Sequence, residues 1–570
     1  MCAPAAPRSL PAPFAWRAPM PRRAADLLVD CLAAHGVDRI FCVPGESYLA
    51  VLDALHDSNA IETIVCRHES GAGFMAVGDA KVTGRPGIAF VSRGPGATNA
   101  SIAVHVAEQD AVPLVLFVGQ VPRGEIGRRS FQEIDYAKTF ADMAKAVHLV
   151  HDPVRIPEIV ARAFVEAQAP TPGPVVVVLP EDMLEERAEA AVVEPMGVPR
   201  GGPPSAEAVS EVAALLAGAE RPLVIAGGPG VGAARGRAAL LAASEAHHLP
   251  VALSFKRQDY FPNTHPNYAG HLGFKIPKVA AERYGRADLI LAVGTRLTEV
   301  TTQGYTLPAS PVPRQPLVHV LDDPCHIGRN YAARGVVADP VAFLEALAAV
   351  PGKAPVGRAA WLRALNEPVV NAMAWAAPAD GLLDMGAVAA SLAKRAERNA
   401  ILVTDAGNFS GWLHRHFPFS GEHLLVGCVG GAMGLGMPAS IAAALRCPGR
   451  QVIHFLGDGG ALMTGGELAT AVQYGAKVKT FISNNGSYGT IRMHQEAAYK
   501  GRVHGTGLRN PDFARWAESF GARGLAIASI AEADRVVAQA LAHDGPVVVD
   551  VKTALEHIAP FTTIAELRRA

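Results

Sequence analysis

The stretches VIHFLGDGG (residues 452–460) and VKTFISNNG (residues 478–486) decide how this chain is expected to fold. Each joins an apolar run of strand length to a polar turn that contains glycine, as expected where a buried strand of an α/β sheet ends. If the two strands are neighbours, Asp458 and Asn485 converge, because the carboxyl ends of parallel strands meet at one edge. Carboxylate and amide oxygens suit Mg²⁺, and the glycines let the backbone approach a diphosphate. Alone, each turn is common, but the pair with 24 intervening residues is far more specific.

Similar apolar runs recur along the chain and alternate with helix-like segments, which predicts an α/β fold of three consecutive doubly wound parallel-sheet domains. The other expected strands lie within DRIFCVPGE (38–46), IETIV (61–65), GIAFVS (87–92), PLVLFVG (113–119), PVVVVLP (174–180), PLVIAGG (222–228), LPVALSF (249–255), DLILAVG (288–294), LVHVLD (317–322), AILVTDAG (400–407) and PVVVDV (546–551). Aperiodic segments rich in proline and glycine separate the three series. We therefore expect an N-terminal domain at 21–192, a central Rossmann-like domain at 205–350 and a third domain at 358–570.

Composition excludes several classes of protein. Of the 570 residues, 50% are hydrophobic and 18% are charged, which excludes an intrinsically disordered chain. The formal net charge is −1 and no basic stripe stands out, so we expect neither nucleic acid nor a membrane as partner. Seven scattered cysteines without C-x-x-C spacing favour a cytoplasmic protein, and no apolar run reaches the roughly 18 residues of a spanning helix. Residues 1–20 are expected to form a disordered tail, with Met20 as an alternative start.

The triplet Arg67-His68-Glu69 follows the expected strand at 61–65. A glutamate at such a place is commonly a solvated residue at the start of a helix, where the macrodipole favours it. A catalytic glutamate that must keep its proton at neutral pH needs apolar, desolvated surroundings instead. The next stretch, GAGFMAVG (71–78), permits such surroundings. The residues alone therefore leave both roles open for Glu69.

Further motifs carry a resemblance to a known family. The segment 92–122 begins SRGPGATN and ends GQVP, FQE stands at 131–133, GAMGLGMPA at 431–439 and ELATAVQYG at 467–475. GDG followed by NN resembles the thiamine diphosphate binding motif. Together these motifs closely resemble acetolactate synthase, a thiamine diphosphate-dependent family, and the resemblance covers residues 22–555.

This resemblance implies thiamine diphosphate and Mg²⁺ as cofactors, held between a pyrimidine-binding first domain and a diphosphate-binding third domain. In that family the glutamate contacts the aminopyrimidine ring and so activates C2 of the thiazolium, and the methionine of the GAMGLG stretch props the two rings. Core filling remains the alternative for this methionine. The implied cofactor-binding residues are Glu69, Met433, Gly457, Asp458, Gly459, Gly460, Asn485 and Ser487. Asp458, Asn485 and the Ser487 carbonyl would hold the metal, and the implied catalytic residues are Glu69, Phe131 and Gln132.

Departures from the family pattern concern the substrate pocket. Arg93 replaces a small residue, and its guanidinium is expected either to hold a carboxylate or to be an exposed loop charge. His494 stands where a tryptophan shapes the acceptor pocket, which leaves the acceptor undecided. Asn408-Phe409 replaces a Gln-His pair, so the diphosphate contacts of that pair are not transferred. Gln120 is a further candidate for the pocket.

The central domain contains a second glycine-rich loop, GGPGVG at 227–232, directly after an expected strand. Such a loop is either a dinucleotide site or a product of close packing. Arg296 occupies a place similar to that of a synthase arginine near FAD. We leave the presence of FAD open.

These observations predict an enzyme that decarboxylates a 2-oxo acid, most simply pyruvate, and transfers the acyl carbanion to a second carbonyl. The alternatives are a simple 2-oxo acid decarboxylase or aldehyde carboligase and an FAD-dependent enzyme similar to pyruvate oxidase. A catalytically inactive subunit is a further alternative, against which the intact Glu69, Asp458 and Asn485 argue. The family resemblance implies a homodimer or homotetramer with active sites at the interface.

Overall fold

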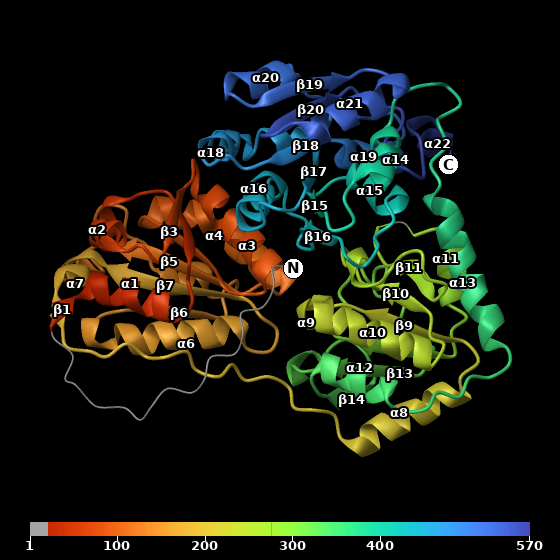
Figure 1. The fold of residues 1–570 in the computed structure, drawn as a ribbon, viewed down its shortest axis with the longest axis horizontal. Coiled ribbons are helices and arrows are strands. Elements are labelled where there is room, and N and C mark those ends of the chain that lie inside the picture. The colour runs from red at the N-terminus through yellow and green to blue at the C-terminus, as the bar shows by residue number, and fades with distance from the viewer. Residues whose placement is uncertain (1–20, 275, 570) are drawn as a thin grey trace.

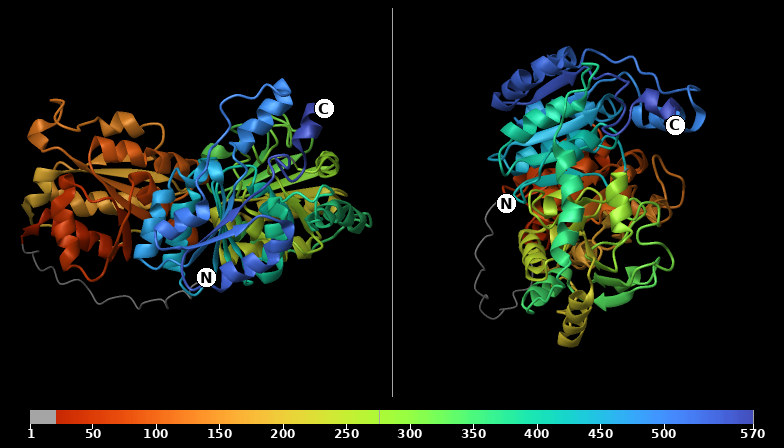
Figure 2. Two further views of the ribbon diagram at one scale, coloured as in Figure 1. Left: turned by 90° about the horizontal axis from the view of Figure 1, so that it is seen from above. Right: turned by 90° about the vertical axis from the view of Figure 1, so that its right-hand side faces the viewer.

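The computed structural model describes residues 21–274 and 276–569, so the expected tail at 1–20 and the alternative start at Met20 lie outside the described residues. Three six-stranded parallel sheets with their helices stand at the corners of a triangle (Figure 1). Seen from above, the red-to-orange N-terminal unit stands to one side of the green and blue units (Figure 2). The predicted α/β fold of three doubly wound parallel sheets is confirmed.

The first sheet has the strand order β3-β2-β4-β5-β7-β6. Its strands are β2 (Arg39–Cys42), β3 (Glu62–Val65), β4 (Gly87–Val91), β5 (Leu114–Gln120), β6 (Ala146–Leu149) and β7 (Pro174–Pro180). Its helices are α1 (Ala24–Ala34), α2 (Leu49–Asp57), α3 (Glu69–Thr83), α4 (Gly94–Asp110), α5 (Tyr136–Phe140), α6 (Ile156–Gln168) and α7 (Glu181–Glu185). Phe41 packs into the core that contains α3 and α4, whereas Ile40 and Cys42 pack into the core with α1 and α6. Both faces of this sheet are therefore buried, as its continuous apolar runs predict.

The second sheet has the strand order β11-β10-β9-β12-β13-β14. Its strands are β9 (Pro222–Ala226), β10 (Val251–Leu253), β11 (Tyr268–His271), β12 (Leu289–Val293), β13 (Leu317–Leu321) and β14 (Arg334–Val337). The helices here are α8 (Ala206–Gly218), α9 (Pro229–Gly232), α10 (Ala234–Ala246), α11 (Lys278–Tyr284), α12 (Pro340–Ala348) and α13 (Arg358–Met373). Residues 189–205, which connect the first unit to α8, contain no regular secondary structure. Before them, β8 (Arg187–Ala188) pairs antiparallel with β1 (Arg22–Arg23).

The third sheet has the strand order β16-β15-β17-β18-β20-β19. Its strands are β15 (Ile401–Thr404), β16 (Leu424–Gly427), β17 (Val452–Gly457), β18 (Val478–Ser483), β19 (Arg523–Ile527) and β20 (Val547–Val551). Its helices are α14 (Met385–Arg395), α15 (Ser410–His416), α16 (Gly436–Arg446), α17 (Asp458–Ala461), α18 (Leu468–Gln473), α19 (Gly489–Tyr499), α20 (Phe513–Ser519), α21 (Ile530–Ala542) and α22 (Ile564–Arg569). The strands β17 and β18 are parallel neighbours, with Gly457 in register with Ser483. The two decisive stretches therefore end side by side.

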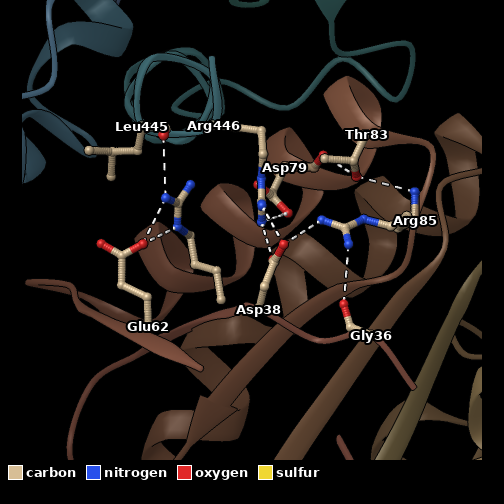
Figure 3. A network of polar contacts seen from close by, with 9 residues as sticks. Gly36, Asp38, Glu62, Asp79, Thr83, Arg85, Leu445 and Arg446 are labelled. Carbon is tan, nitrogen blue, oxygen red and sulfur yellow. Dashed lines mark hydrogen bonds and ion pairs between the residues drawn. The ribbon is translucent and has the colours of Figure 1, made fainter. Parts of the chain in front are cut away.

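Helices α3 and α16 join the first and third units (Figure 1). A Cβ atom built on Gly78 would lie 2.6 Å from Cα of Ala439, so the helices approach as closely as glycine allows. At the end of α16, Arg446 pairs with Asp79 and Asp38 of the first unit (Figure 3). Apolar contact, a largely buried ion pair with Asp79 and an exposed one with Asp38 thus join the two units.

Two properties concern the described part of the chain as a whole. Within residues 21–274 and 276–569, no helix has both the length and the apolar character to cross a bilayer. None of the six cysteines in the same ranges forms a disulfide, and five of them are buried.

Candidate active site

The two polar turns after β17 and β18 form one structure. The Gly486 amide donates a hydrogen bond of 2.7 Å to Oδ2 of Asp458. Asn510 bridges the same turns, because its Nδ2 donates to Asp458 Oδ2 at 2.8 Å and to Asn484 Oδ1 at 2.9 Å. The neighbouring Asn485 accepts the Ser487 amide through Oδ1 at 3.0 Å. The structure therefore brings Asp458, Asn485 and Ser487 together at the carboxyl edge of the third sheet.

The Asp458 carboxylate is buried among neutral donors. The residue is 4% exposed. Burial raises the pKa of Asp458 above the ordinary value of an aspartate. Among the described residues, no lysine, arginine or histidine forms an ion pair with it. A buried carboxylate without a countercharge is costly, and a divalent cation would supply that charge. The oxygen donors at this edge thus fit the Mg²⁺ that the sequence predicts.

The glycines of the GDGG turn allow bulky groups to lie against the site. A Cβ atom on Gly457 would lie 2.7 Å from the Phe409 ring, and one on Gly459 would lie 2.6 Å from the Tyr488 ring. Cε of Met433 lies 3.4 Å from that same Gly459 Cβ position. Met433 is therefore beside the GDGG turn, where the sequence predicts a residue that contacts the cofactor.

The loop that carries Met433 is held from two sides. The Gly434 amide donates to Asp405 Oδ2 at 2.7 Å, and its carbonyl accepts the Thr464 hydroxyl at 2.7 Å. Burial raises the pKa of Asp405 to about 6. On the other side, the Gly430 amide donates to the buried carboxylate of Asp110 in the first unit at 2.8 Å. This second contact makes the position of the Met433 loop depend on the first unit.

Glu69 begins helix α3 in the first unit. Its Oε2 accepts a hydrogen bond of 2.9 Å from Nδ2 of Asn99, and the residue is only partly buried. His68, to which the sequence assigns no role, caps the helix, because its Nδ1 accepts the Ser70 amide at 3.1 Å. Glu69 thus starts a helix, as the first of its two expected roles requires, and its carboxyl group contacts the GATN motif. Its catalytic role stays a prediction.

Of the remaining pocket candidates, some are exposed or partly exposed and two, Gln120 and Arg93, are buried. Phe131 is 76% exposed, Gln132 has a positive φ of 66°, and His494 lies exposed along a cleft. Gln120 is 3% exposed, and its Oε1 accepts the Val121 amide at 2.9 Å. Arg93 is 7% exposed and pairs with Glu46 and Glu181. The alternative that Arg93 is an exposed loop charge is therefore wrong, and its partners are two carboxylates of the protein.

A cleft of about 1670 Å³ lies between the central and third units. Asn408, Thr490 and His494 line one wall, and Arg296 lines another. Asn408 is fixed there, because its amide donates to the Thr490 hydroxyl at 3.1 Å. The cleft is therefore bounded by residues of the third unit and of the central unit, and Asp458 is not among its lining residues.

The glycine-rich loop at 227–232 is explained by close packing. A Cβ atom on Gly228, whose φ is +78°, would lie 2.0 Å from the Gly294 carbonyl oxygen. One on Gly232 would lie 2.3 Å from the Tyr260 ring. These contacts support close packing as the reason for the glycines. None of residues 227–232 lines the large cleft.

Comparison with known proteins places this geometry in a family. Three family models match in order: the N-terminal TPP binding domain of thiamine pyrophosphate enzymes at residues 22–139, their central domain at 209–347 and their C-terminal TPP binding domain at 405–551. The acetolactate synthase large subunit of Parasynechococcus marenigrum is 34% identical over 94% of this chain and 88% of the relative. The chain belongs to the thiamine pyrophosphate enzyme family.

Other members of the thiamine pyrophosphate enzyme family are similarly distant. The acetolactate synthase isozyme 1 large subunit of Escherichia coli is 30% identical over 93% of this chain and 94% of its own. The putative thiamine pyrophosphate-containing protein YdaP of Bacillus subtilis is 30% identical over 95% and 93%. The chain is thus similar to proteins with both names over at least 93% of its residues.

Several polar residues that hydrogen-bond to the candidate site or to the turn before it were not predicted from the sequence. They are Asn99, Asp110, Asp405, Glu467 and Asn510. Asp405 follows an expected strand directly, and Asn99 and Glu467 lie inside motifs that the sequence singled out, so a weak signal existed for these three. Asp110 also lies within the segment 92–122 that carries the resemblance, whereas no local pattern marks Asn510, whose partners lie 52 and 26 residues away in the sequence.

Proposed function

We propose that this thiamine pyrophosphate enzyme decarboxylates a 2-oxo acid, pyruvate first among them, and transfers the acyl carbanion to a second carbonyl, as an acetolactate synthase does. The observation that carries the proposal is the hydrogen bond from the Gly486 amide to Asp458, which joins the GDG and NN turns in one site. The relatives named acetolactate synthase, which match over nearly the whole chain, support the same reaction class.

Thiamine diphosphate would bind with its phosphate end at the third unit, next to Mg²⁺. Asp458, Asn485 and the Ser487 carbonyl would hold the metal, and Gly457, Gly459 and Gly460 would let the backbone lie close to the diphosphate. When bound, the cofactor supplies the electron sink for the pair released as the 2-oxo acid loses CO₂. The side chain of Met433 would support the cofactor rings from beside the GDGG turn.

Glu69 would hold and deliver a proton at the far ring of the cofactor. Asn99 already orients its carboxyl group through the bond at 2.9 Å. Phe131 and Gln132 would lie on the acceptor side, and His494 would give this side a polar wall. Because Arg93 is paired with Glu46 and Glu181, it would shape the loop beside the pocket rather than bind the substrate carboxylate.

A complete site would require a second copy of the chain. Glu69 is partly exposed, Phe131 is 76% exposed, and Leu462 and Met463 beside the GDGG turn are 53% and 51% exposed. Apolar side chains exposed next to catalytic groups are characteristic of an interface that a partner covers. We therefore propose a homodimer or homotetramer in the cytoplasm, with domains at 21–192, 205–350 and 358–570.

Product analysis with pyruvate tests the reaction. Purified protein, reconstituted with thiamine diphosphate and Mg²⁺, is expected to form acetolactate and CO₂ and to stop when the cofactors are removed by chelation and dialysis. Acetaldehyde or acetoin as sole product would establish the simple decarboxylase or carboligase instead. Peroxide release together with yellow, FAD-containing protein would establish the oxidase, for which the large cleft offers room.

The metal assignment is tested separately by calorimetry. Asp458→Asn is expected to lower the affinity for thiamine diphosphate with Mg²⁺ by at least about tenfold, because the only carboxylate of the proposed ligand set loses its charge. Asp544→Asn is the matched control, since that carboxylate is exposed on the same unit and pairs only with Lys477 among the salt bridges of the described residues. Equal affinity in the two variants would refute the metal site.

A further inference from the structure

A buried carboxylate of the third unit reaches into the first unit next to Glu69. Glu467 is 1% exposed and stands at the end of a short 3-10 helix, Gly465–Glu467, nine residues after Asp458. It lies in the ELATAVQYG motif, and the proposed reaction assigns it no role. Its position is therefore of interest as a link between the first and third units of one chain.

Both oxygens of Glu467 accept hydrogen bonds. Oε1 accepts the backbone amides of Arg67 and His68, each at 3.0 Å. Oε2 accepts the Arg67 amide at 3.2 Å and the Thr470 hydroxyl at 2.6 Å. A Cβ atom on Gly71 would lie 2.1 Å from Oε1, so helix α3 carries glycine where the carboxylate passes.

The two amides that Glu467 accepts belong to the turn between β3 and α3. The helix itself begins at Glu69, and its cap is the side chain of His68, which accepts the Ser70 amide. Arg67 and His68 come before the helix and after the end of β3, so their amides have no partner within a helix or strand and take an acceptor from elsewhere. A carboxylate from another unit fills that need, so the backbone just before Glu69 takes its position from the third unit.

Neighbouring residues of the third unit form hydrogen bonds with the same segment, Val65–His68. The Val65 amide donates to the Tyr474 hydroxyl at 2.9 Å, and Nη2 of Arg67 donates to Oε1 of Gln473 at 2.6 Å. The segment Val65–His68 is thus held along its length by α18 and by the residues that flank it.

We infer that Glu467 is a positioning residue that fixes the turn at Arg67 and His68 and thereby sets the position of Glu69. This inference rests on the proposed role of Glu69 in activating the cofactor. A small shift of a catalytic group can cost about 10²-fold in rate, so loss of this anchor should slow activation without weakening cofactor binding.

The first test uses amide hydrogen exchange on the protein without cofactor. In Glu467→Ala, the amides of Arg67 and His68 should exchange at least about tenfold faster than in the wild type, because they lose a buried acceptor. Glu467→Gln keeps an acceptor oxygen at the same reach and should exchange within about threefold of the wild-type rate. Unchanged exchange in Glu467→Ala, or equally fast exchange in both variants, would overturn the inference.

The second test measures deuterium exchange at C2 of bound thiamine diphosphate and its dissociation constant. Glu467→Ala should slow C2 exchange by about 10²-fold while the dissociation constant changes less than about threefold, and Glu467→Gln should restore most of the rate. If Glu467→Ala does not fold, Glu467→Asp replaces it, because aspartate keeps the charge but is one methylene too short to reach the turn. Wild-type C2 exchange in the variant without the acceptor would refute the positioning role.

Asp79→Asn is the matched control, because it weakens the contact between α3 and α16 without touching the turn. It should leave C2 exchange at the wild-type rate, and slow exchange in this control would also overturn the inference. A separate variant distinguishes failure of the proposed function from failure of this inference. If Glu69→Gln exchanges C2 as fast as the wild type, Glu69 has no activating role, whatever the Glu467 variants do.

Discussion

Arg446 at the end of α16 forms a two-point ion pair with Asp79 in the middle of α3, with Nε–Oδ1 and Nη2–Oδ2 distances of 2.7 and 3.1 Å (Figure 3). The Asp79 side chain is 7% exposed, so this guanidinium is the countercharge of a buried carboxylate. The pair sits at the junction of the first and third units, which are far apart in the sequence. Its strength therefore bears on the stability of the junction between the first and third units of one chain.

Arg446→Met should destabilise the protein by about 3 kcal/mol or more, because it leaves Asp79 buried without a countercharge. Arg85→Met is the control, since Arg85 is half-exposed and its pair with the exposed Asp38 is worth about 1 kcal/mol or less. Urea unfolding followed by circular dichroism measures both. Equal midpoints for the two variants would contradict the importance of the buried pair.

Gly78→Ala should loosen the same junction by a different mechanism. The added Cβ would lie 2.6 Å from the Ala439 Cα, so the helices must separate, at a cost of about 1–3 kcal/mol. Gly218→Ala at the end of α8 is the control, because its added Cβ meets no atom within 4 Å. Thermal unfolding should show a lower midpoint for Gly78→Ala only. A control variant that is equally destabilised would point to backbone effects rather than to helix contact.

The sequence predicts the strands in the middle of each sheet better than those at the edges. All the expected runs became strands, but β6, β11, β14, β16 and β19 were not expected, and each lies at a sheet edge. An edge strand is covered less completely, and its residues need not form an apolar run. In β14, for example, three of four residues are exposed, and in β6 all four are only partly buried. For β6 and β14, the neighbouring strand rather than an apolar run of their own therefore specifies the strand, whereas β11 and β16 are mostly buried and this reason does not apply to them.

Some residues of the candidate site were predictable from the sequence around them, whereas others depend on contacts with residues far along the chain. Asp458 and Asn485 each follow a strand that the sequence predicts, so their convergence was predictable on the condition that the two strands are neighbours, which the structure confirms. Glu467 contacts the turn at Arg67 and His68, which lie some 400 residues earlier, and no periodicity encodes such a contact. Residue type alone did not identify the partners of Arg93. An arginine can bind a substrate carboxylate, but here it pairs with Glu46 and Glu181 of the protein itself.

Asp405 should give the protein a pH dependence near pH 6. Burial raises its pKa to about 6, above the value of about 4 for an aspartate in an unfolded chain. Between these two values the folded protein binds a proton that the unfolded chain does not, so stability should fall as pH rises from about 4 to about 6. Above pH 6 the loss is complete and stability should no longer depend on this group.

Infrared spectroscopy with pH titration checks this assignment, because a protonated carboxyl group has its own C=O band. A band that disappears near pH 6 in the wild type should be missing in Asp405→Asn. The variant should also lack the fall in unfolding midpoint between pH 4 and 6. A wild-type band that persists through that range in the variant would assign the titration to another group.

Leu462→Asp should weaken the proposed association of two copies. Leu462 is 53% exposed directly after the GDGGA turn, and Met463 beside it is 51% exposed, so the pair forms an apolar surface next to the proposed metal site. A carboxylate buried there without a partner is costly, and a loss of about 1.4 kcal/mol raises the dissociation constant tenfold. Sedimentation velocity over a range of concentrations should show this shift.

Val356→Asp is the control for that experiment, because Val356 is fully exposed in the segment between α12 and α13 and far along the chain from the site. It should associate as the wild type does. The Leu462→Asp variant should also lose activity in proportion to its dissociation, since a separated chain would have only half of each proposed site. Full activity in a monomeric Leu462→Asp protein would show that one chain suffices. Glu69 and Asp458 of the same chain would then serve one site.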